Sequence, residues 1–288
     1  MATSQAHKLG EFIGDFFEDL MKKPIRDFAE KNHLYFDTAG NREAREGKKV
    51  TWTDIHGSKH DLDFVLEKGG TESIIGDPVA FIELAWRRYT RHSKNKAQEI
   101  AGAVDPICEK YRLIKPFKGA ILSGQFTENS LNQLRNDDFH ILYIPFSTMV
   151  AAFKKYGLDI DFDEGTKEAE FRVKYATVAK KTNRPILEQI RQEIFYRCAP
   201  EINQFIAELG ASFSRKISSI CILPLHGTRV EVENIKSAID FINDYKGIMR
   251  FQFTVESMES VEQVLDTFFA QKEYKGAYTR GHLKRGVE

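Results

Sequence analysis

The chain has 288 residues, with 42 Lys and Arg balancing 42 Asp and Glu and an apolar content of 42%. This composition fits a globular protein with a sizeable core, and the zero net charge points to no class of partner. Three widely spaced cysteines, Cys108, Cys198 and Cys221, form neither a disulfide framework nor a zinc-ligand spacing, and no apolar run is long enough to cross a bilayer. We therefore expect reduced thiols in a cytoplasmic protein without a membrane segment.

Apolar periodicity and turn signals divide the N-terminal part of the chain into helices and strands. Apolar residues at i, i+3, i+4 and i+7 predict helices, and alternating or continuous short apolar runs predict strands. The elements expected in chain order are a helix at 8–30, a strand at 33–36, a loop at 37–48, hairpin arms at 50–55 and 60–66, a loop at 67–78, a strand at 79–84, a helix from 93 to about 112, a strand at 118–123, a helix at 127–136, a strand at 139–144 and a helix at 147–156.

From residue 79 onward strands and helices alternate, which predicts parallel strands joined by helical crossovers. The acidic stretch 158–165 is expected to be a solvated linker that ends a first domain, residues 1–165. An α+β accessory unit for recognition or dimerisation, residues 166–288, would follow. Its expected elements are a helix from 185 to about 209 interrupted at Pro200, hairpin arms at 217–225 and 229–232, a helix at 234–245, a strand at 248–256, a helix at 260–271 and a flexible tail at 278–288.

Two acids occupy apolar strands in the first domain. Asp63 lies among alternating apolar residues, and Glu83 lies in the continuous apolar run 79–84. A buried acid is costly unless it is paired, protonated or bound to a metal. Two carboxylates from consecutive strands, with a main-chain carbonyl, supply the hard oxygen ligands that Mg²⁺ prefers. The alternative is two unrelated acids at strand ends, each contacting water or arginine.

A dense set of cations follows Glu83 directly. Aromatic residues lie among these cations, which suits phosphate contacts combined with stacking on bases. The alternative is a solvated start of a helix, although cations at a helix N-terminus oppose its macrodipole. The cations are Arg87, Arg88, Arg91, Lys94 and Lys96.

Signatures of other chemistries are absent from the sequence. There is no Gly-x-Ser-x-Gly nucleophile motif, no Gly-x-x-x-x-Gly-Lys phosphate loop and no Gly-x-Gly-x-x-Gly dinucleotide motif. His56 and His60 flank a turn and are not expected to bind a metal. No organic cofactor is therefore expected, and an enzyme acting on a small molecule is the weakest of the candidate functions.

The order of these elements resembles the PD-(D/E)xK superfamily of restriction-endonuclease-like nucleases. The superfamily core is a helix, a β-meander bearing an Asp and then a (Glu/Asp)-x-Lys, a helix and another strand. Asp63 in His-Asp-Leu-Asp-Phe-Val matches the Asp strand, and Glu83 in Phe-Ile-Glu-Leu-Ala matches the next strand. Lys96 and Gln98 resemble the Lys-x-Gln often found on the following helix. Glu18, in Gly-x-x-x-Glu, resembles an acidic position that supports the metal in some members.

The resemblance, which covers residues 8–156, implies an α/β fold with a restriction-endonuclease-like core, a central mixed sheet flanked by helices, and a C-terminal α+β unit. It implies a metal-dependent endonuclease of restriction type that hydrolyses phosphodiester bonds in double-stranded DNA. Asp63 and Glu83 would bind Mg²⁺, for which Mn²⁺ can substitute, and Glu18, Gln98 and Lys96 would support them. Cutting both strands usually takes two active sites, so a homodimer is expected. The residues expected to contact DNA are Arg87, Arg88, Arg91, Lys94 and Lys96.

One position departs from the superfamily pattern. Ala85 stands where the superfamily has its catalytic lysine. The charge could have moved to Arg87, Lys94 or Lys96, although an arginine would be a poor base because it stays protonated near neutral pH. Alternatively the residue has been altered to disable the enzyme, or the fold has lost catalysis and kept binding, which would give a catalytically inactive DNA-binding or interaction protein.

Overall fold

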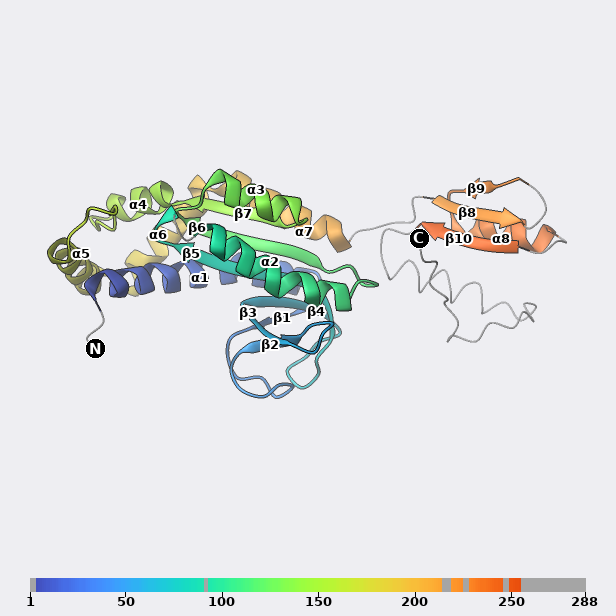
Figure 1. Ribbon diagram of the computed structural model, residues 1–288, viewed down its shortest axis with the longest axis horizontal. Helices are drawn as coiled ribbons and strands as arrows, with labels where there is room; N and C mark the ends of the chain where they lie inside the picture. Colours follow the sequence, from blue (N-terminus) through green and yellow to red (C-terminus); the bar gives the residue numbers. More distant parts are fainter. Residues whose placement is uncertain (1–3, 91–92, 214–218, 225–227, 246–248, 255–288) are drawn as a thin grey trace. The chain divides into compact units, whose positions relative to one another are not determined.

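The computed structural model describes residues 4–90, 93–213, 219–224, 228–245 and 249–254 (Figure 1). The chain forms two compact units, residues 1–212 and 213–288. The elements of the first unit are α1 (Gln5–Lys31), β1 (Leu34–Thr38), β2 (Val50–Thr53), β3 (Lys59–Leu62), β4 (Phe64–Lys68), β5 (Asp77–Arg87), α2 (Ser93–Lys110), β6 (Phe117–Gly124), α3 (Glu128–Asn136), β7 (His140–Pro145), α4 (Phe146–Lys155), α5 (Glu168–Lys181), α6 (Arg184–Arg197) and α7 (Ala199–Phe213).

A mixed five-stranded sheet forms the centre of the first unit. Its strand order is β1-β4-β5-β6-β7. β1 and β4 are antiparallel, as are β4 and β5, whereas β5, β6 and β7 run parallel. The antiparallel neighbours are joined by loops and the parallel ones by helical crossovers, as parallel pairing requires. The expected α/β fold with a central mixed sheet flanked by helices is therefore confirmed.

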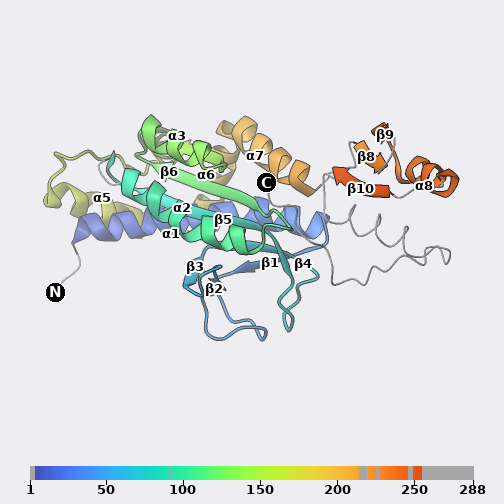
Figure 2. The same cartoon turned by 45° about the vertical axis from the view of Figure 1, so that its right-hand side comes forward.

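Alternation along β5 divides its side chains between the two faces of the sheet. Phe81 and Ala85 pack in a buried cluster with α2 and α3, whereas Trp86 lies against α1 and α4. On the same side as Trp86, a Cβ added to Gly119 of β6 would lie 3.1 Å from the ring of Phe205 in α7. The helices α2 and α3 thus cover one face, and α1, α4 and α7 cover the other (Figure 1, Figure 2).

Two of the expected strands have different bounds in the structure. The second hairpin arm, expected as one strand at 60–66, is divided at Asp63 into β3, which pairs with β2, and β4, which joins the main sheet. The expected strand 79–84 continues to Arg87 because all eight residues from Ala80 to Arg87 pair with β6. Asp63 consequently lies at the point where the chain passes from one sheet to the other.

A buried ion network fixes the two long loops between these strands. The Arg42 guanidinium contacts the carboxylates of Asp37 at 2.8 Å and Glu67 at 2.6 Å, and these three side chains are at most 3% exposed. Arg42 also donates to the carbonyl oxygens of Thr71 and Ile74. One side chain from the first loop therefore holds the second loop in place, and buried charges paired in this way cost little only while every partner is present.

The stretch 158–165 is not the solvated linker that its acidity suggested. Leu158, Ile160 and Phe162 are buried, and the aspartates between them are exposed. Phe162 contacts Phe146 and Phe171, with ring centroids 4.9 and 5.4 Å apart. The alternating apolar residues anchor the segment on the core, so the chain stays on the first unit beyond residue 165.

Helices after residue 165 complete the first unit. α5, which the sequence patterns did not predict, packs on α1, and α6 packs on α4. The single helix expected over 185–209 is two helices, which meet at Cys198 rather than at Pro200. The division between the units falls at 212/213 instead of the expected 165/166, because these helices bury their apolar faces on the preceding part of the chain.

The second unit is a small α+β structure. β8 (Ser219–Pro224) lies between β10 (Met249–Thr254) and β9 (Val230–Val232) in an antiparallel sheet. The helix α8 (Ile235–Asp244) places Ala238 against Ile220 and Ile222 in a small apolar cluster. The helix expected at 260–271 and the tail expected at 278–288 lie outside the described residues.

Candidate active site

The structure brings the carboxylates of Asp63 and Glu83 to one place. The main-chain N–H of Asp63 donates to Oε1 of Glu83 at 3.3 Å, and the main-chain N–H of Leu84 donates to Oδ2 of Asp63 at 2.7 Å. Each acid thus contacts the backbone beside the other. This reciprocal arrangement follows from the break between β3 and β4, which frees the Asp63 amide from a strand ladder.

Burial and mutual repulsion disfavour two negative charges at this position. Glu83 is 7% exposed, and burial followed by the charge of Asp63 raises its pKa to about 8. Burial also raises the pKa of Asp63, against the hydrogen bond from Leu84. Two carboxylates buried this close together either share a proton or have their charges offset by a cation.

Lys96 of α2 is the cation whose charge reaches both acids. Its charge lowers the pKa of Asp63 and of Glu83, against the larger effect of burial. Its side chain is 13% exposed, and its Nζ lies 2.7 Å from Oε1 of Glu99. Arg87, on the same face of β5 as Glu83, places Nη2 3.8 Å from the same Glu99 carboxylate and donates from Nη1 to the carbonyl of Trp86.

α1 contributes one acid and one base to the same site. Glu18 raises the pKa of Asp63 and Lys22 lowers it, so both charges act on Asp63. The two side chains form an ion pair of 2.9 Å and lie one helical turn apart. Sequence reasoning identified Glu18 and missed Lys22 and Glu99. The i,i+4 spacing of Glu18 and Lys22, and the i,i+3 spacing of Lys96 and Glu99, would have indicated both.

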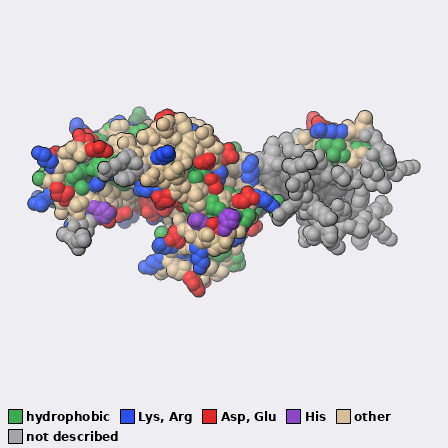
Figure 3. Space-filling view, in the orientation of Figure 1, with side chains coloured by type: hydrophobic (Ala, Val, Ile, Leu, Met, Phe, Trp, Pro, Cys, Tyr) green, Lys and Arg blue, Asp and Glu red, His purple; other side chains and the backbone are tan. Residues whose placement is uncertain are grey.

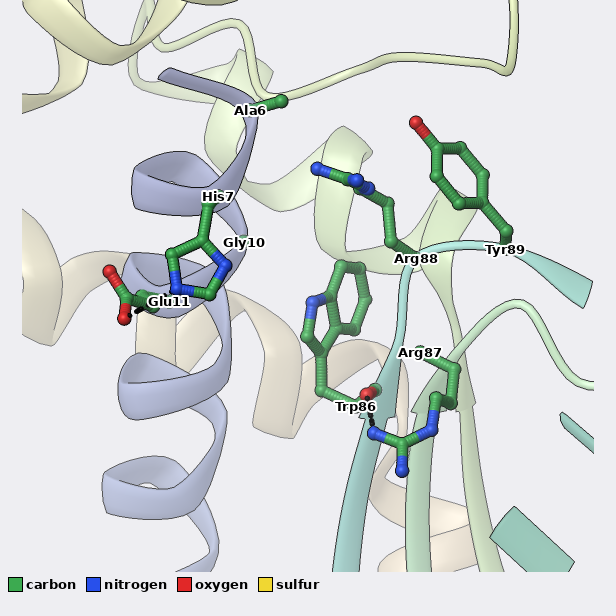
Figure 4. A pocket seen from close by; sticks show the side chains of 8 residues that line it. All are labelled: Ala6, His7, Gly10, Glu11, Trp86, Arg87, Arg88 and Tyr89. Atoms are coloured by element: carbon green, nitrogen blue, oxygen red, sulfur yellow. Dashed lines mark hydrogen bonds and ion pairs between the residues drawn. The ribbon is translucent and has the colours of Figure 1, made fainter. Parts of the chain in front are cut away.

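Other residues predicted for the site lie elsewhere. Gln98 is exposed on α2 and lies two residues from Lys96, so it points to a different side of the helix. Lys94 is exposed at the start of α2, and Arg91 lies outside the described residues. Arg88 points to the face of β5 opposite Arg87, where its guanidinium lies 4.6 Å from the ring centre of Tyr89 (Figure 4).

Among the described residues, the basic side chains that follow Glu83 therefore form no single patch. Arg87, the last residue of β5, lies near Glu99 on the α2 side, and Lys96 pairs with the same Glu99. Arg88 follows the strand and lies beside the rings of Tyr89 and Phe171. Figure 3 shows acidic and basic side chains interspersed over the face in view. Long-range steering of a polyanion by one broad basic surface is not a feature of this face.

The carboxylate pair fits a hard divalent cation by its chemistry. Among the residues that the structure describes, no group of three or more His, Cys, Asp or Glu side chains is arranged to hold a metal. The donors here are the two carboxylates of Asp63 and Glu83, and Mg²⁺ commonly completes its octahedron with water and main-chain oxygen.

Comparison with known proteins gives little further information. Within the described part of the chain, no helix has the length and apolarity needed to cross a membrane. No protein-family model matches the sequence, and no curated protein does. Among solved structures, a crystal structure of a protein of unknown function, AF1548, aligns with 68% of this chain and 98% of its own, at 11% identity and a TM-score of 0.28. A likeness at this level assigns neither a fold family nor a function.

Proposed function

We propose that the protein is a metal-dependent endonuclease of restriction type, with the PD-(D/E)xK arrangement, that hydrolyses phosphodiester bonds in double-stranded DNA. The observation that carries this proposal is the desolvated pair of Asp63 and Glu83, each hydrogen-bonded to main chain beside the other. The sequence order around the pair supports it, because a helix, a carboxylate at the start of β4, a carboxylate in β5 and then a basic helix follow one another as in that superfamily.

In this proposal Asp63 and Glu83 would hold Mg²⁺ through their carboxylates. When bound, the ion would polarise the scissile phosphate and lower the pKa of the attacking water. Glu83 must lose its proton before it can act as a ligand, so neutral to alkaline pH favours the competent state. Glu18 adds a third negative charge from α1, and Lys22 limits how much that charge disfavours ionisation of Asp63.

Lys96 is the best replacement for the lysine missing at position 85. Ala85 is 4% exposed and packs in the apolar cluster that includes Ala97, so the local environment of β5 suits a small apolar side chain there. Lys96 brings an ammonium group to the acids from α2 instead. It would orient the attacking water and stabilise the negative charge that develops on the phosphate.

The rival function is a DNA-binding or interaction protein without catalysis. Ala85 is the specific observation that favours it, because the motif lysine is absent from its usual strand. The same arrangement of Asp63 and Glu83 would then hold a structural cation or a shared proton. Turnover, rather than binding, separates the two functions.

Supercoiled plasmid incubated with the purified protein and Mg²⁺ or Mn²⁺ tests the proposal. We expect nicked and linear products, which disappear with EDTA and in Asp63→Asn and Glu83→Gln. Glu109→Gln, which changes an exposed acid of α2 paired with Arg112, is the matched control and should cleave like the wild type. DNA binding with no cleavage under either metal would favour the rival function. Equal cleavage by the wild type and both site variants would remove the acid pair from the mechanism.

A further inference from the structure

A pocket of about 370 Å³ lies between α1 and the end of β5 (Figure 4). On the strand side it is lined by Trp86, Arg88 and Tyr89, and on the helix side by Gly10 and His7. Its size suits a small aromatic ligand, since ligand pockets commonly begin at about 300 Å³. Arg87, which lies 3.8 Å from Glu99 on the α2 side, also lines the pocket, whereas neither Asp63 nor Glu83 does.

One glycine of α1, Gly10, lines this pocket, and a second, Gly14, lies close to Trp86. Gly10 and Gly14 are one helical turn apart, and a Cβ at Gly14 would lie 3.7 Å from Cδ1 of Trp86. A Cβ at Gly10 would meet nothing within 4 Å, so this position borders open space. Glycine inside a helix costs about 1 kcal/mol relative to alanine. In the described structure no close packing at Gly10 offsets that cost.

The groups that face the pocket combine a π surface with hydrogen-bond donors. Figure 4 shows the indole nitrogen of Trp86 turned toward α1, and within the described residues its N–H has no hydrogen-bond acceptor. The Arg88 guanidinium lies against the rings of Tyr89 and Phe171 and forms no ion pair within the described part of the chain. The Glu11 carboxylate is paired with His7 at 2.9 Å and lies on the far side of His7 from Arg88 (Figure 4).

We propose that this pocket binds a nucleotide, with its base against Trp86 beside Gly10 and its phosphate on Arg88. A planar base fits a space bounded by an indole and a helix backbone without a side chain, and stacking on an aromatic ring accepts any base. The Arg88 guanidinium, whose carbon lies 4.6 and 5.8 Å from the centres of two rings, would receive a phosphate through two parallel hydrogen bonds. A purely aliphatic ligand would leave the indole N–H and the arginine charge unused.

The position of the pocket identifies the nucleotide as part of a DNA strand, and this step rests on the proposed nuclease function. Trp86 follows Glu83 by three residues, which is about 10 Å along a strand. On α1, eight residues separate Gly10 from Glu18, which is about 12 Å along the helix. Three base-pair steps of B-form DNA also span about 10 Å. The pocket would therefore hold an unpaired or extruded base close to the scissile phosphate.

Titration of the full-length protein with deoxyadenosine monophosphate, followed by tryptophan fluorescence, tests the pocket independently of cleavage. The chain has two tryptophans, and Trp52 is buried. We expect saturable quenching in the wild type and in Asp63→Asn, and its loss in Trp86→Phe. Gly10→Leu fills the pocket and should raise the dissociation constant at least tenfold. Arg88→Gln should do the same for the monophosphate and leave binding of the free nucleoside deoxyadenosine unchanged.

Gly102→Leu is the matched control, because Gly102 is also a helical glycine whose added Cβ would meet nothing within 4 Å. It should bind the nucleotide like the wild type. The absence of quenching at millimolar nucleotide, or equal binding by Gly10→Leu and Gly102→Leu, would overturn the pocket proposal. Plasmid cleavage without nucleotide binding would overturn the pocket alone. Nucleotide binding without cleavage would keep the pocket and remove the nuclease function.

Discussion

Lys96 and Glu99 lie one turn apart on α2 and form an ion pair of 2.7 Å in which the lysine is 13% exposed and the glutamate 63%. The partially buried cation is thus held by a partner that is itself in solvent. Pairs of this kind contribute little to stability, on the order of 0.5 kcal/mol. The contact instead fixes the position of an ammonium group whose charge lowers the pKa of both Asp63 and Glu83.

Lys96→Met should lower the rate of plasmid cleavage by about 10²- to 10³-fold, the usual loss when one group that stabilises the transition state is removed. DNA binding should change little, because a single contact to the phosphates is lost. Lys94→Met, on the exposed side of the same helix turn, is the control and should retain the rate. Cleavage rates and binding by gel shift measure the two effects. Full activity in Lys96→Met would assign the lysine role to another residue.

The raised pKa of Glu83 makes stability depend on pH. The folded protein keeps a proton on this group up to about pH 8, whereas the unfolded chain loses it near the ordinary value of 4.5. Between these values the folded state binds more protons, so the free energy of unfolding falls as pH rises, by at most about 1.4 kcal/mol per pH unit. Glu83→Gln removes this loss and should raise the melting temperature at pH 9 more than at pH 5.

A divalent metal should stabilise the folded protein more as pH rises, because it favours the ionised form of Glu83. At the proposed site Mg²⁺ would bind the ionised carboxylate, so its stabilisation of the wild type should grow between pH 6 and pH 9 and vanish in Glu83→Gln. Thermal melting with and without 10-fold excess metal over the pH series measures it, with Glu109→Gln as control. A metal effect that is equal at all pH values, or that persists in Glu83→Gln, would show that the cation binds elsewhere.

Arg42→Ala should destabilise the first unit by roughly 3–5 kcal/mol, the usual cost of removing one partner from a buried ion network. Glu67 would lose its cation while fully buried, and Asp37 would retain only Arg45, at 3.2 Å. Urea unfolding measures the change in free energy. Lys48→Ala, an exposed lysine of the same loop, should change it by less than about 0.5 kcal/mol.

A chain ending at residue 213 should fold, and one ending at residue 165 should not. The shorter chain lacks α5, α6 and α7, and so it exposes the surfaces under Ile190, Ile194, Phe205 and Leu209, all of which are at most 2% exposed. Losing one such side chain typically costs 2–5 kcal/mol, and four exceed the stability of an ordinary domain. Near-ultraviolet circular dichroism and cooperative thermal melting distinguish the two chains. A cooperative transition in the 165-residue chain would contradict this expectation.

The sheet could be predicted from sequence because its strands are strongly patterned. The continuous apolar run around Glu83 and the alternating apolar residues around Asp63 identified both acids. The same patterns identified the neighbouring strands on which the acids lie. Parallel pairing of β5, β6 and β7 followed from the alternation of strands and helices. The hydrogen bonds that join Asp63 and Glu83 to main chain beside each other could not be predicted. Leu62, Phe64 and Leu66 continue a single apolar alternation, so the sequence pattern hides the break in the strand at Asp63.

Other features left no periodic signal. α5 buries only Phe171 and Val178 among its residues, too few to mark an apolar face. Arg42 is a lone cation in a polar loop, and its buried partners come from distant positions in the sequence. The aspartates of 158–165 led to the prediction of a solvated linker, although the apolar residues between them are buried. In each case long-range packing decides the structure, and a local pattern carries no information about it.

α1 continues without interruption from Gln5 to Lys31 and presents Gly10 and Glu18 on one side. A single helix therefore sets the distance between Gly10 in the pocket and Glu18, whose charge acts on Asp63. That distance cannot stretch with the sequence of the DNA or with the motion of a loop. If both sites engage one DNA strand, the protein would cut that strand at a constant number of nucleotides from the base that it holds in the pocket. One residue inserted between Gly14 and Glu18 would turn the acid by about 100° and uncouple the two sites.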